Sequence, residues 1–272
     1  MLKQRLLVGF IGGIIAIVIL CLNVKVVSVV LAILAIIGLS EIYNATGILK
    51  KHNKLCIGSY VYSLIAFIVL AFVPEPGLSL AVMIALYGFL LLMYMIFKHE
   101  ECDFTSINEL FFQTLYVSVL FAHIILVRRL DHGNYIIWII FITAWLSDTA
   151  AFAVGKRFGR NKLIPQISPK KTVEGAIGGL LGSVVFNLIF GLVCSNGFDL
   201  DVNFGALTLL ALIAGVLSQL GDLTASCIKR AHNIKDFSNL LPGHGGILDR
   251  FDSVLFVAPT VYYVSVIFSV IS

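Results

Sequence analysis

The chain has 272 residues, of which 59% are apolar and 12% are charged, and its mean hydropathy is +1.01. Soluble domains usually carry about 25% charged residues, so this composition excludes an ordinary soluble protein. Nineteen Lys and Arg against fifteen Asp and Glu give a net charge of +4. The cytoplasmic loops of a membrane protein produce such a mild excess, which gives no reason to expect nucleic-acid binding.

Apolar runs long enough to cross a bilayer recur along the whole chain. They predict about nine spans, at residues 6–23, 26–43, 55–73, 78–97, 108–127, 135–154, 173–194, 204–225 and 254–271. Backbone groups inside a bilayer have no water to bind, so each span is expected to be helical. The predicted fold is an all-α, polytopic integral membrane protein.

Basic residues give the expected orientation of these spans. With the N-terminus inside, all of the 19 Lys and Arg except Lys25, Arg128 and Arg129 fall on the inner side. Two polar segments, 155–172 and 226–253, then lie on that inner face. We predict that the functional chemistry is concentrated there, on the cytoplasmic side of the cell membrane.

Acidic residues in and beside the spans are the first candidates for function. Asp148 and Asp222 lie inside spans near their inner ends, where an ionised side chain is costly and often functional. Asp249 and Asp252 are spaced i, i+3 at the start of the last span. We hypothesise that Asp222 and Asp249 hold a divalent cation, with Asp148 and Asp252 as further candidate ligands. Oxygen ligands beside phosphate-bearing substrates favour Mg²⁺.

Basic residues gather in or beside the same two inner segments. They are Lys170, Lys171, Lys229, Arg230, Lys235 and Arg250. Arg offers a planar fork for phosphate and Lys a mobile point charge, so the group suits a site that handles several phosphoryl groups. Two alternatives stay open: the pairs only mark the inner face, or Lys229, Arg230 and Arg250 form structural salt bridges with the acids.

A glycine-rich stretch, LPGHGG, precedes the last span. Gly243, Gly245 and Gly246 allow a sharp turn and a close approach of backbone N–H groups to a phosphate. A helix that begins just after this turn would add its positive end. His244 is interpreted first as a turn residue, with ligand or proton donor as alternatives.

Taken together, residues 226–252, SCIKRAHNIKDFSNLLPGHGGILDRFD, resemble the signature of the CDP-diacylglycerol synthases, also called phosphatidate cytidylyltransferases. The matching positions are Ser226, Lys229, Arg230, Lys235, Asp236, Ser238, Pro242, His244, Gly245, Gly246, Asp249, Arg250 and Asp252. Upstream, residues 147–160 and the segment SPKKTVEG at 168–175 are similar to two further elements of the family. Phe152 stands where the family often has Tyr, and over 1–130 the resemblance consists of hydropathy.

The resemblance implies the reaction of CTP with phosphatidic acid to give CDP-diacylglycerol and pyrophosphate, with Mg²⁺, at the inner membrane face. It implies a catalytic region over 131–272, with two cytoplasmic loops, after an N-terminal transmembrane region over 1–130. Implied catalytic residues are Lys229, Arg230, Asp249 and Arg250. Implied substrate-binding residues are Ser168, Lys170, Lys171, Thr172, Ser226, Lys235, Asp236, His244, Gly245 and Gly246. A homodimer is left open.

Two rival functions fit parts of the sequence. Intramembrane acids such as Asp148 also occur along ion paths, although the paired broken spans typical of transporters are not evident. A CTP-using polyprenol kinase would transfer the terminal phosphoryl group and release CDP. The nature of the product separates these possibilities.

Overall fold

The structure is a computed structural model that describes the backbone of residues 2–272 and the side chains of residues 12–272. The chain forms two compact units. Unit 1 comprises Met1–Leu126 and Ile234–Arg250, and unit 2 comprises Val127–Asn233 and Phe251–Ser272. The polar segment at 226–253 is therefore divided between the two units.

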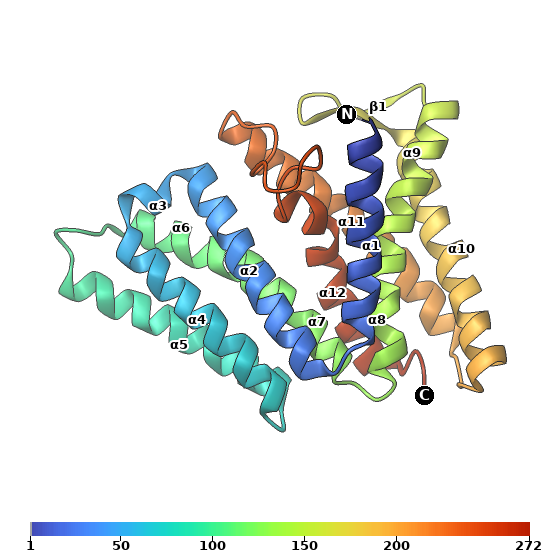
Figure 1. The fold of residues 1–272 in the computed structure, drawn as a ribbon, viewed down its shortest axis with the longest axis horizontal. Coiled ribbons are helices and arrows are strands. Elements are labelled where there is room, and N and C mark those ends of the chain that lie inside the picture. Colours follow the sequence, from blue (N-terminus) through green and yellow to red (C-terminus); the bar gives the residue numbers. More distant parts are fainter. Residues whose placement is uncertain (1) are drawn as a thin grey trace. The chain divides into compact units, whose positions relative to one another are not determined.

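Unit 1 is a bundle of apolar helices. It contains α1 (Leu2–Cys21), α2 (Val24–Thr46), the short α3 (Ile48–Lys51), α4 (Asn53–Phe72), α5 (Pro76–Phe97), α6 (Phe104–Thr114), the π-helical segment η1 (Leu115–Val119) and most of α7 (Leu120–Arg128). Figure 1 shows α4 between α2 and α5, and α4 packs on both. The unit is completed by a loop and the first residues of α12 (Leu248–Phe268).

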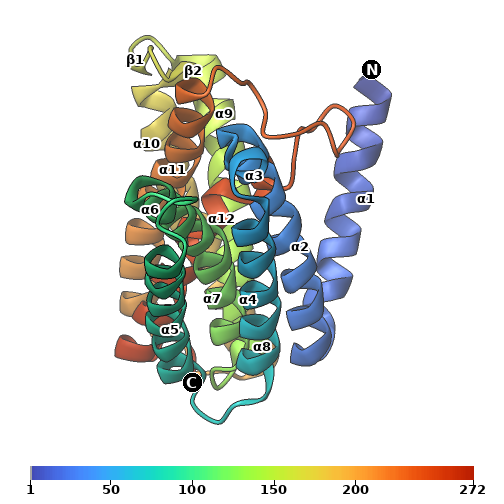
Figure 2. The same ribbon diagram turned by 90° about the vertical axis from the view of Figure 1, so that its left-hand side faces the viewer.

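Unit 2 combines long helices with one hairpin. It contains α8 (Gly133–Phe141), the π-helical segment η2 (Ile142–Leu146), α9 (Ser147–Phe158), β1 (Lys162–Ile164), β2 (Ser168–Thr172), α10 (Val173–Phe198), α11 (Phe204–Ala231) and the rest of α12. Helix α10 packs against both α9 and α11, and Figure 2 shows β1 and β2 at one end of these helices.

The transmembrane prediction is confirmed for eight spans. Within the described residues, eight helices are long and apolar enough to cross a membrane. They are Val24–Thr46, Asn53–Phe72, Pro76–Phe97, Phe104–Arg128, Gly133–Phe158, Val173–Phe198, Phe204–Ala231 and Leu248–Phe268. The first predicted span, 6–23, coincides with α1, but the side chains of residues 6–11 lie outside the described residues. The protein is an all-α polytopic membrane protein.

Side-chain caps explain where several of these helices begin. Asn23, Asp103, Thr172 and Asn203 each accept a hydrogen bond from a backbone N–H in the first turn of the helix that follows. Such caps satisfy donors that the first turn of a helix leaves without an intrahelical partner. The helix starts therefore follow from local sequence, even in a chain dominated by apolar residues.

A chain of buried hydroxyl groups links the helices of unit 1. The Thr114 hydroxyl lies 2.7 Å from that of Tyr43 and 2.8 Å from that of Tyr87. Tyr87 also lies 2.7 Å from the Ser59 hydroxyl. Hydrogen bonds of this kind join membrane helices with about 0.6–2 kcal/mol each. They give α2, α4, α5 and α6 a defined packing that apolar contacts alone would not specify.

The hairpin of β1 and β2 is the feature of unit 2 that the all-helical prediction lacked. The strands are antiparallel, with Lys162 opposite Thr172 and Ile164 opposite Ser168. Glu174, in the first turn of α10, accepts hydrogen bonds from the backbone N–H groups of Arg160 and Asn161. The polar segment 155–172 is thus an ordered connection between α9 and α10.

Candidate functional site

A cavity of about 430 Å³ lies within unit 2, beside the hairpin. Its walls come from α9, β1, β2, α10 and α11. The lining residues are Asp148, Ala151, Phe152, Gly155, Lys156, Leu163, Lys170, Lys171, Thr172, Gly175, Ala176, Gln219 and Asp222. Five of the predicted site residues are therefore brought together here: Asp148, Lys170, Lys171, Thr172 and Asp222.

Small residues bring the backbones of α9 and α10 together at this cavity. A Cβ built on Gly175 would lie 3.2 Å from the Cα of Gly155 and 2.9 Å from the Ala151 carbonyl oxygen. The Thr172 hydroxyl fits beside both glycines while it accepts a hydrogen bond of 3.1 Å from the Gly175 N–H. Larger side chains at Gly155 or Gly175 would push the helices apart and shift Thr172.

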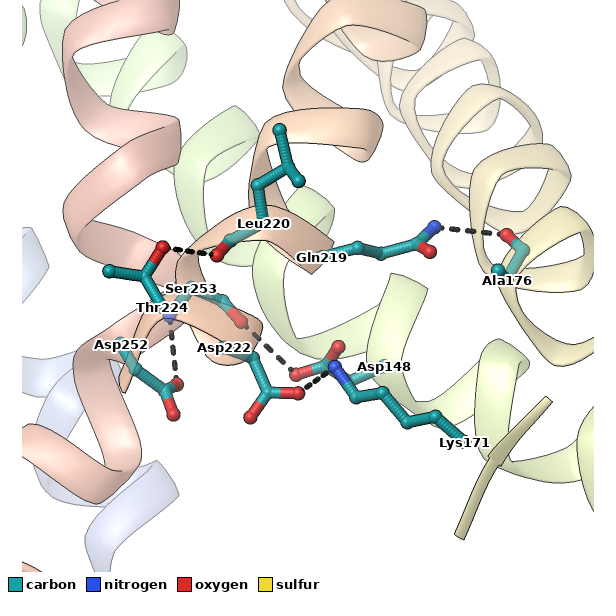
Figure 3. Close-up of polar contacts among 9 residues, drawn as sticks. All are labelled: Asp148, Lys171, Ala176, Gln219, Leu220, Asp222, Thr224, Asp252 and Ser253. Atoms are coloured by element: carbon teal, nitrogen blue, oxygen red, sulfur yellow. Dashed lines mark hydrogen bonds and ion pairs between the residues drawn. The ribbon is translucent and has the colours of Figure 1, made fainter. Parts of the chain in front are cut away.

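Three acids from three helices and one lysine gather at this end of unit 2 (Figure 3). Asp222 on α11 forms an ion pair with Lys171 on β2. Asp148 on α9 accepts a long hydrogen bond of 3.5 Å from the Ser253 hydroxyl on α12. In Figure 3, Asp148, Asp222 and Lys171 point toward one another, and Asp252 lies beside Asp222.

Asp252 is the most enclosed of these acids, with 8% of its surface exposed. Its carboxylate lies within electrostatic reach of Asp222, Asp148 and Lys229, and it accepts a 2.8 Å hydrogen bond from the Ser253 N–H. Lys229 is also 8% exposed, which is unusual for a lysine unless a negative charge is close. The cluster thus combines several like charges with one buried cation, Lys229, and the partly exposed Lys171.

The donor chemistry of the cluster fits Mg²⁺ better than a softer metal, because the acids offer only oxygen. Within the described part of the chain, however, no three His, Cys, Asp or Glu side chains are arranged to hold a metal ion by themselves. Lys171 also occupies the Asp222 carboxylate. A magnesium ion here would need oxygen ligands from water and phosphate as well, which is its usual behaviour in proteins.

Asp249, the other predicted metal ligand, belongs to unit 1 and binds the glycine-rich loop. Its Oδ2 atom accepts hydrogen bonds from the N–H groups of Phe237 at 2.8 Å and Gly246 at 2.9 Å. The predicted turn is present, with positive φ at Gly243 (77°) and Gly245 (82°). The Gly246 N–H, considered above for phosphate, is engaged by Asp249 in this structure. A metal shared by Asp222 and Asp249 would join residues of different units and stays a prediction.

The remaining predicted residues differ in exposure. Arg230, Lys235, Asp236 and Arg250 are exposed, whereas Ser168, Ser226 and His244 are half-buried. The His244 Nδ1 atom is buried and has no hydrogen-bond partner within the described residues. Their assignment to substrate binding or catalysis stays a prediction.

Three residues that the structure places in important positions were not predicted. Lys156 and Gln219 line the cavity, and Gln219 donates a 2.9 Å hydrogen bond to the Ala176 carbonyl. Gln219 and Asp222 are spaced i and i+3 on one helix, and this spacing could have indicated that Gln219 lies beside the same cavity as Asp222. Glu41, which lies near the end of α2 and is not among the predicted site residues, binds the loop of unit 1.

The fold and the cavity define a class: a polytopic membrane protein with a charged cavity at one end of its apolar helices. Sequence comparison gives the family. The profile of the "Cytidylyltransferase family" matches residues 3–268. A Bacillus subtilis (strain 168) protein named "Phosphatidate cytidylyltransferase" is 34% identical over 275 residues, covering 98% of this chain and 99% of the relative.

Relatives in another genus carry the same name. The Staphylococcus haemolyticus protein is 35% identical over 263 residues, which cover 95% of this chain and 96% of the relative. The Staphylococcus aureus (strain COL) protein has the same identity and coverage. The chain belongs to the cytidylyltransferase family.

Proposed function

We propose that this protein is an enzyme that transfers the cytidylyl group of CTP to phosphatidic acid, giving CDP-diacylglycerol and pyrophosphate. One observation carries the proposal: the family match extends over residues 3–268, and relatives named for this activity align along nearly the whole chain. The charged cavity of unit 2 supports it, because both reactants are polyanions that need cations for binding.

The reaction needs charge neutralisation more than a strong base. A phosphate oxygen of the lipid forms a bond to the α-phosphorus of CTP, and the bond from that phosphorus to the bridging oxygen of the β-phosphate breaks. The electron pair leaves with pyrophosphate. Since a phosphomonoester loses its second proton near pH 6, the nucleophile is largely ionised at neutral pH. Catalysis then depends on alignment and electrostatic stabilisation.

The cations of the cavity are suited to this task. Lys156, Lys170 and Lys171 all reach its lining. We assign them to phosphate groups, where their charge reduces repulsion between the two reactants and stabilises the pyrophosphate that leaves. The buried Lys229 keeps the adjoining acids in place, because Asp252 would otherwise be enclosed among like charges.

Asp148, Asp222 and Asp252 would supply part of the oxygen ligands of Mg²⁺, with water and phosphate oxygens as the others, and the ion would supply charge stabilisation to bound phosphates. When no metal is bound, the ion pair with Lys171 neutralises the negative charge of the Asp222 carboxylate. Lys171 is free to turn toward a phosphate because its ammonium group sits on a flexible stem.

The walls of the cavity also suit a lipid. Apolar side chains of Ala151, Phe152 and Leu163 stand beside the charged ones, and Phe152 is 71% exposed. An amphipathic substrate needs both kinds of surface, with its acyl chains kept in the bilayer and its headgroup at the membrane edge. The excess of Lys and Arg in the inner segments supports a site that faces the cytoplasm, where CTP is available.

The test uses purified full-length protein, phosphatidic acid and CTP labelled at the α-phosphate. We expect the label in CDP-diacylglycerol, with one pyrophosphate released per lipid product and a requirement for Mg²⁺. Release of CDP with a phosphorylated lipid would replace this proposal by a lipid kinase. Absence of any covalent product, together with solute movement across vesicles, would favour a transporter.

A further inference from the structure

A buried glutamate of unit 1 contacts the glycine-rich loop from a distant part of the sequence. Glu41 lies on α2, close to the end of that helix. Its Oε1 atom accepts hydrogen bonds from the Ser238 hydroxyl at 2.6 Å and from the Ile247 N–H at 2.9 Å. Its Oε2 atom accepts one from the Leu248 N–H at 2.8 Å.

These contacts explain how an acid is tolerated in a membrane span. Glu41 is only 4% exposed, and a buried carboxylate is stable only when donors replace its lost water. Backbone N–H groups cannot reverse their role, so both carboxylate oxygens must act as acceptors. An amide in place of the carboxylate would turn one NH₂ group toward these donors. The site therefore requires a glutamate rather than a glutamine.

The same contacts make Glu41 a cap for α12. Leu248 is the first residue of that helix, and the N–H groups of its first turn lack intrahelical acceptors. A negative charge at this end is also favoured by the helix dipole. Glu41 thus fixes where α12 begins, although it lies about 200 residues earlier in sequence.

Glycines allow α2 and the loop before α12 to approach each other this closely. A Cβ built on Gly246 would overlap the Glu41 carboxylate. A Cβ on Gly38, nearly one turn before Glu41, would lie 3.0 Å from the Leu248 side chain. The absence of side chains on both partners leaves room for direct hydrogen bonds without an intervening water.

Asp249 also binds this turn, through backbone N–H groups that neighbour those bound by Glu41. Its Oδ2 atom accepts from the Gly246 and Phe237 N–H groups, next in sequence to the donors that Glu41 binds. A Cβ on Gly245 would lie 2.8 Å from that oxygen. The direction of the Asp249 carboxylate is therefore coupled to the turn that Glu41 fixes.

We infer that Glu41 is a positioning residue: it anchors residues 238–248 and so sets the place of Asp249 and of the signature loop for the reaction. The catalytic consequence rests on the proposed function, while the anchoring itself does not. Misplacement of a reacting group by about 1 Å can cost roughly 10²-fold in rate. Loss of Glu41 is therefore expected to reduce turnover without a direct contact to substrate.

The test compares wild type, Glu41→Gln and Glu109→Gln in the full-length protein. Glu109 is a matched control, because it lies on a helix of the same unit and binds Gln113 rather than the loop. Backbone hydrogen exchange is measured for peptides from 234–250 and from the other helices. Glu41→Gln is expected to speed exchange at least about tenfold in 234–250 only, as expected from loss of about 1.4 kcal/mol of local protection.

Kinetics provide a second readout on the same proteins. We expect Glu41→Gln to lower kcat about 10²-fold while the KM for CTP changes less than about threefold, and Glu109→Gln to match wild type. Ser238→Ala removes one donor and should have a smaller effect. When Ser238→Ala is combined with Glu41→Gln, kcat should fall little below that of Glu41→Gln alone, because both substitutions remove the same contact.

Each outcome has one meaning. Unchanged exchange in 234–250, or wild-type kcat, in Glu41→Gln would overturn the inference. Faster exchange throughout unit 1 would show a general packing role instead and overturn it too, and additive effects of Ser238→Ala would do the same. If wild type formed no CDP-diacylglycerol, the proposed function would fail, and the exchange comparison would still decide whether Glu41 anchors the loop.

Discussion

Unit 1 and unit 2 use their carboxylates in different ways. In unit 1, Glu41 and Asp249 bind backbone N–H groups of one loop, and those donors cannot leave unless the loop changes shape. In unit 2, Asp222 is paired with the flexible side chain of Lys171 beside a cavity. Under the proposed function, such a partner is exchanged for a metal ion or released to a phosphate, because its ammonium group sits on a flexible stem.

This contrast separates carboxylates that hold a shape from carboxylates that exchange ligands. The side chains of Lys171 and Asp222 are 28% and 26% exposed, so their ion pair contributes little to stability. The buried acids of unit 1 contribute through several directional bonds. Charge-removing substitutions should therefore have different consequences in the two units.

The largest expected effect is that of Asp249→Asn. An asparagine oxygen can still accept from the Phe237 and Gly246 N–H groups, so the loop is retained while the charge is lost. Because the family resemblance assigns the Asp249 charge to catalysis in addition to its contacts with the loop, turnover should fall about 10³-fold, with unchanged exchange in 234–250. Asp249→Ala should also loosen the loop. Near-normal turnover in purified Asp249→Asn would remove this charge from the mechanism.

Asp222→Asn is expected to lower turnover about 10²-fold, because one charged group of the unit 2 cluster is lost. The melting temperature should stay within about 2 °C of wild type, as the ion pair is partly solvated. Asp201→Asn, an exposed acid of the same unit, serves as the control. A large drop in melting temperature for Asp222→Asn would contradict an exchangeable role.

Lys171→Met tests the exchange directly. We expect the KM for CTP to rise about tenfold, the value of one charge-assisted hydrogen bond. The Mg²⁺ concentration for half-maximal rate should fall, because the competing ammonium is gone from Asp222. Lys170→Met, the neighbouring cavity residue, is expected to raise KM without changing the Mg²⁺ requirement. An unchanged requirement in Lys171→Met would show that Lys171 and metal do not compete.

The smallest effect is expected away from both carboxylate regions, at the start of α6. Hydrogen bonds from the Ser106 side chain and N–H hold the pKa of Asp103 below its usual value. A depressed folded-state pKa means that the cap stabilises the fold above the unfolded pKa of about 4. That contribution is lost as pH falls through the folded pKa. In Asp103→Asn the melting temperature should therefore depend less on pH between about pH 2 and 5 than it does in wild type. Activity at pH 7 should be unchanged.

Much of the fold could be predicted because apolar run length alone identifies a membrane span. The hairpin could not, since it depends on pairing Lys162 with Thr172 across a turn and on Glu174 binding the chain before β1. Neither β1 nor β2 is longer than five residues, too short for a reliable alternation of apolar and polar side chains.

The site was predictable in its residue types and less so in its partnerships. Lys171 and Asp222 were each nominated, one for phosphate and one for metal, but the salt bridges considered from sequence involved Lys229, Arg230 or Arg250. Spacing along a helix predicts neighbours on that helix, whereas the Lys171–Asp222 pair joins a strand to a helix. The contact of Glu41 with the loop joins residues that are even farther apart in the sequence.

The cap that Glu41 provides has a consequence for biosynthesis. Its three donors belong to residues 238, 247 and 248, which the ribosome adds about 200 residues after α2 has been made. During that interval α2 must enter the bilayer with an acid that has not yet met these donors, at a cost of a few kcal/mol. Assembly of unit 1 therefore waits for a late segment of the nascent polypeptide. When a ribosome is stalled before residue 238, α2 should be less protected against backbone hydrogen exchange than in the finished protein.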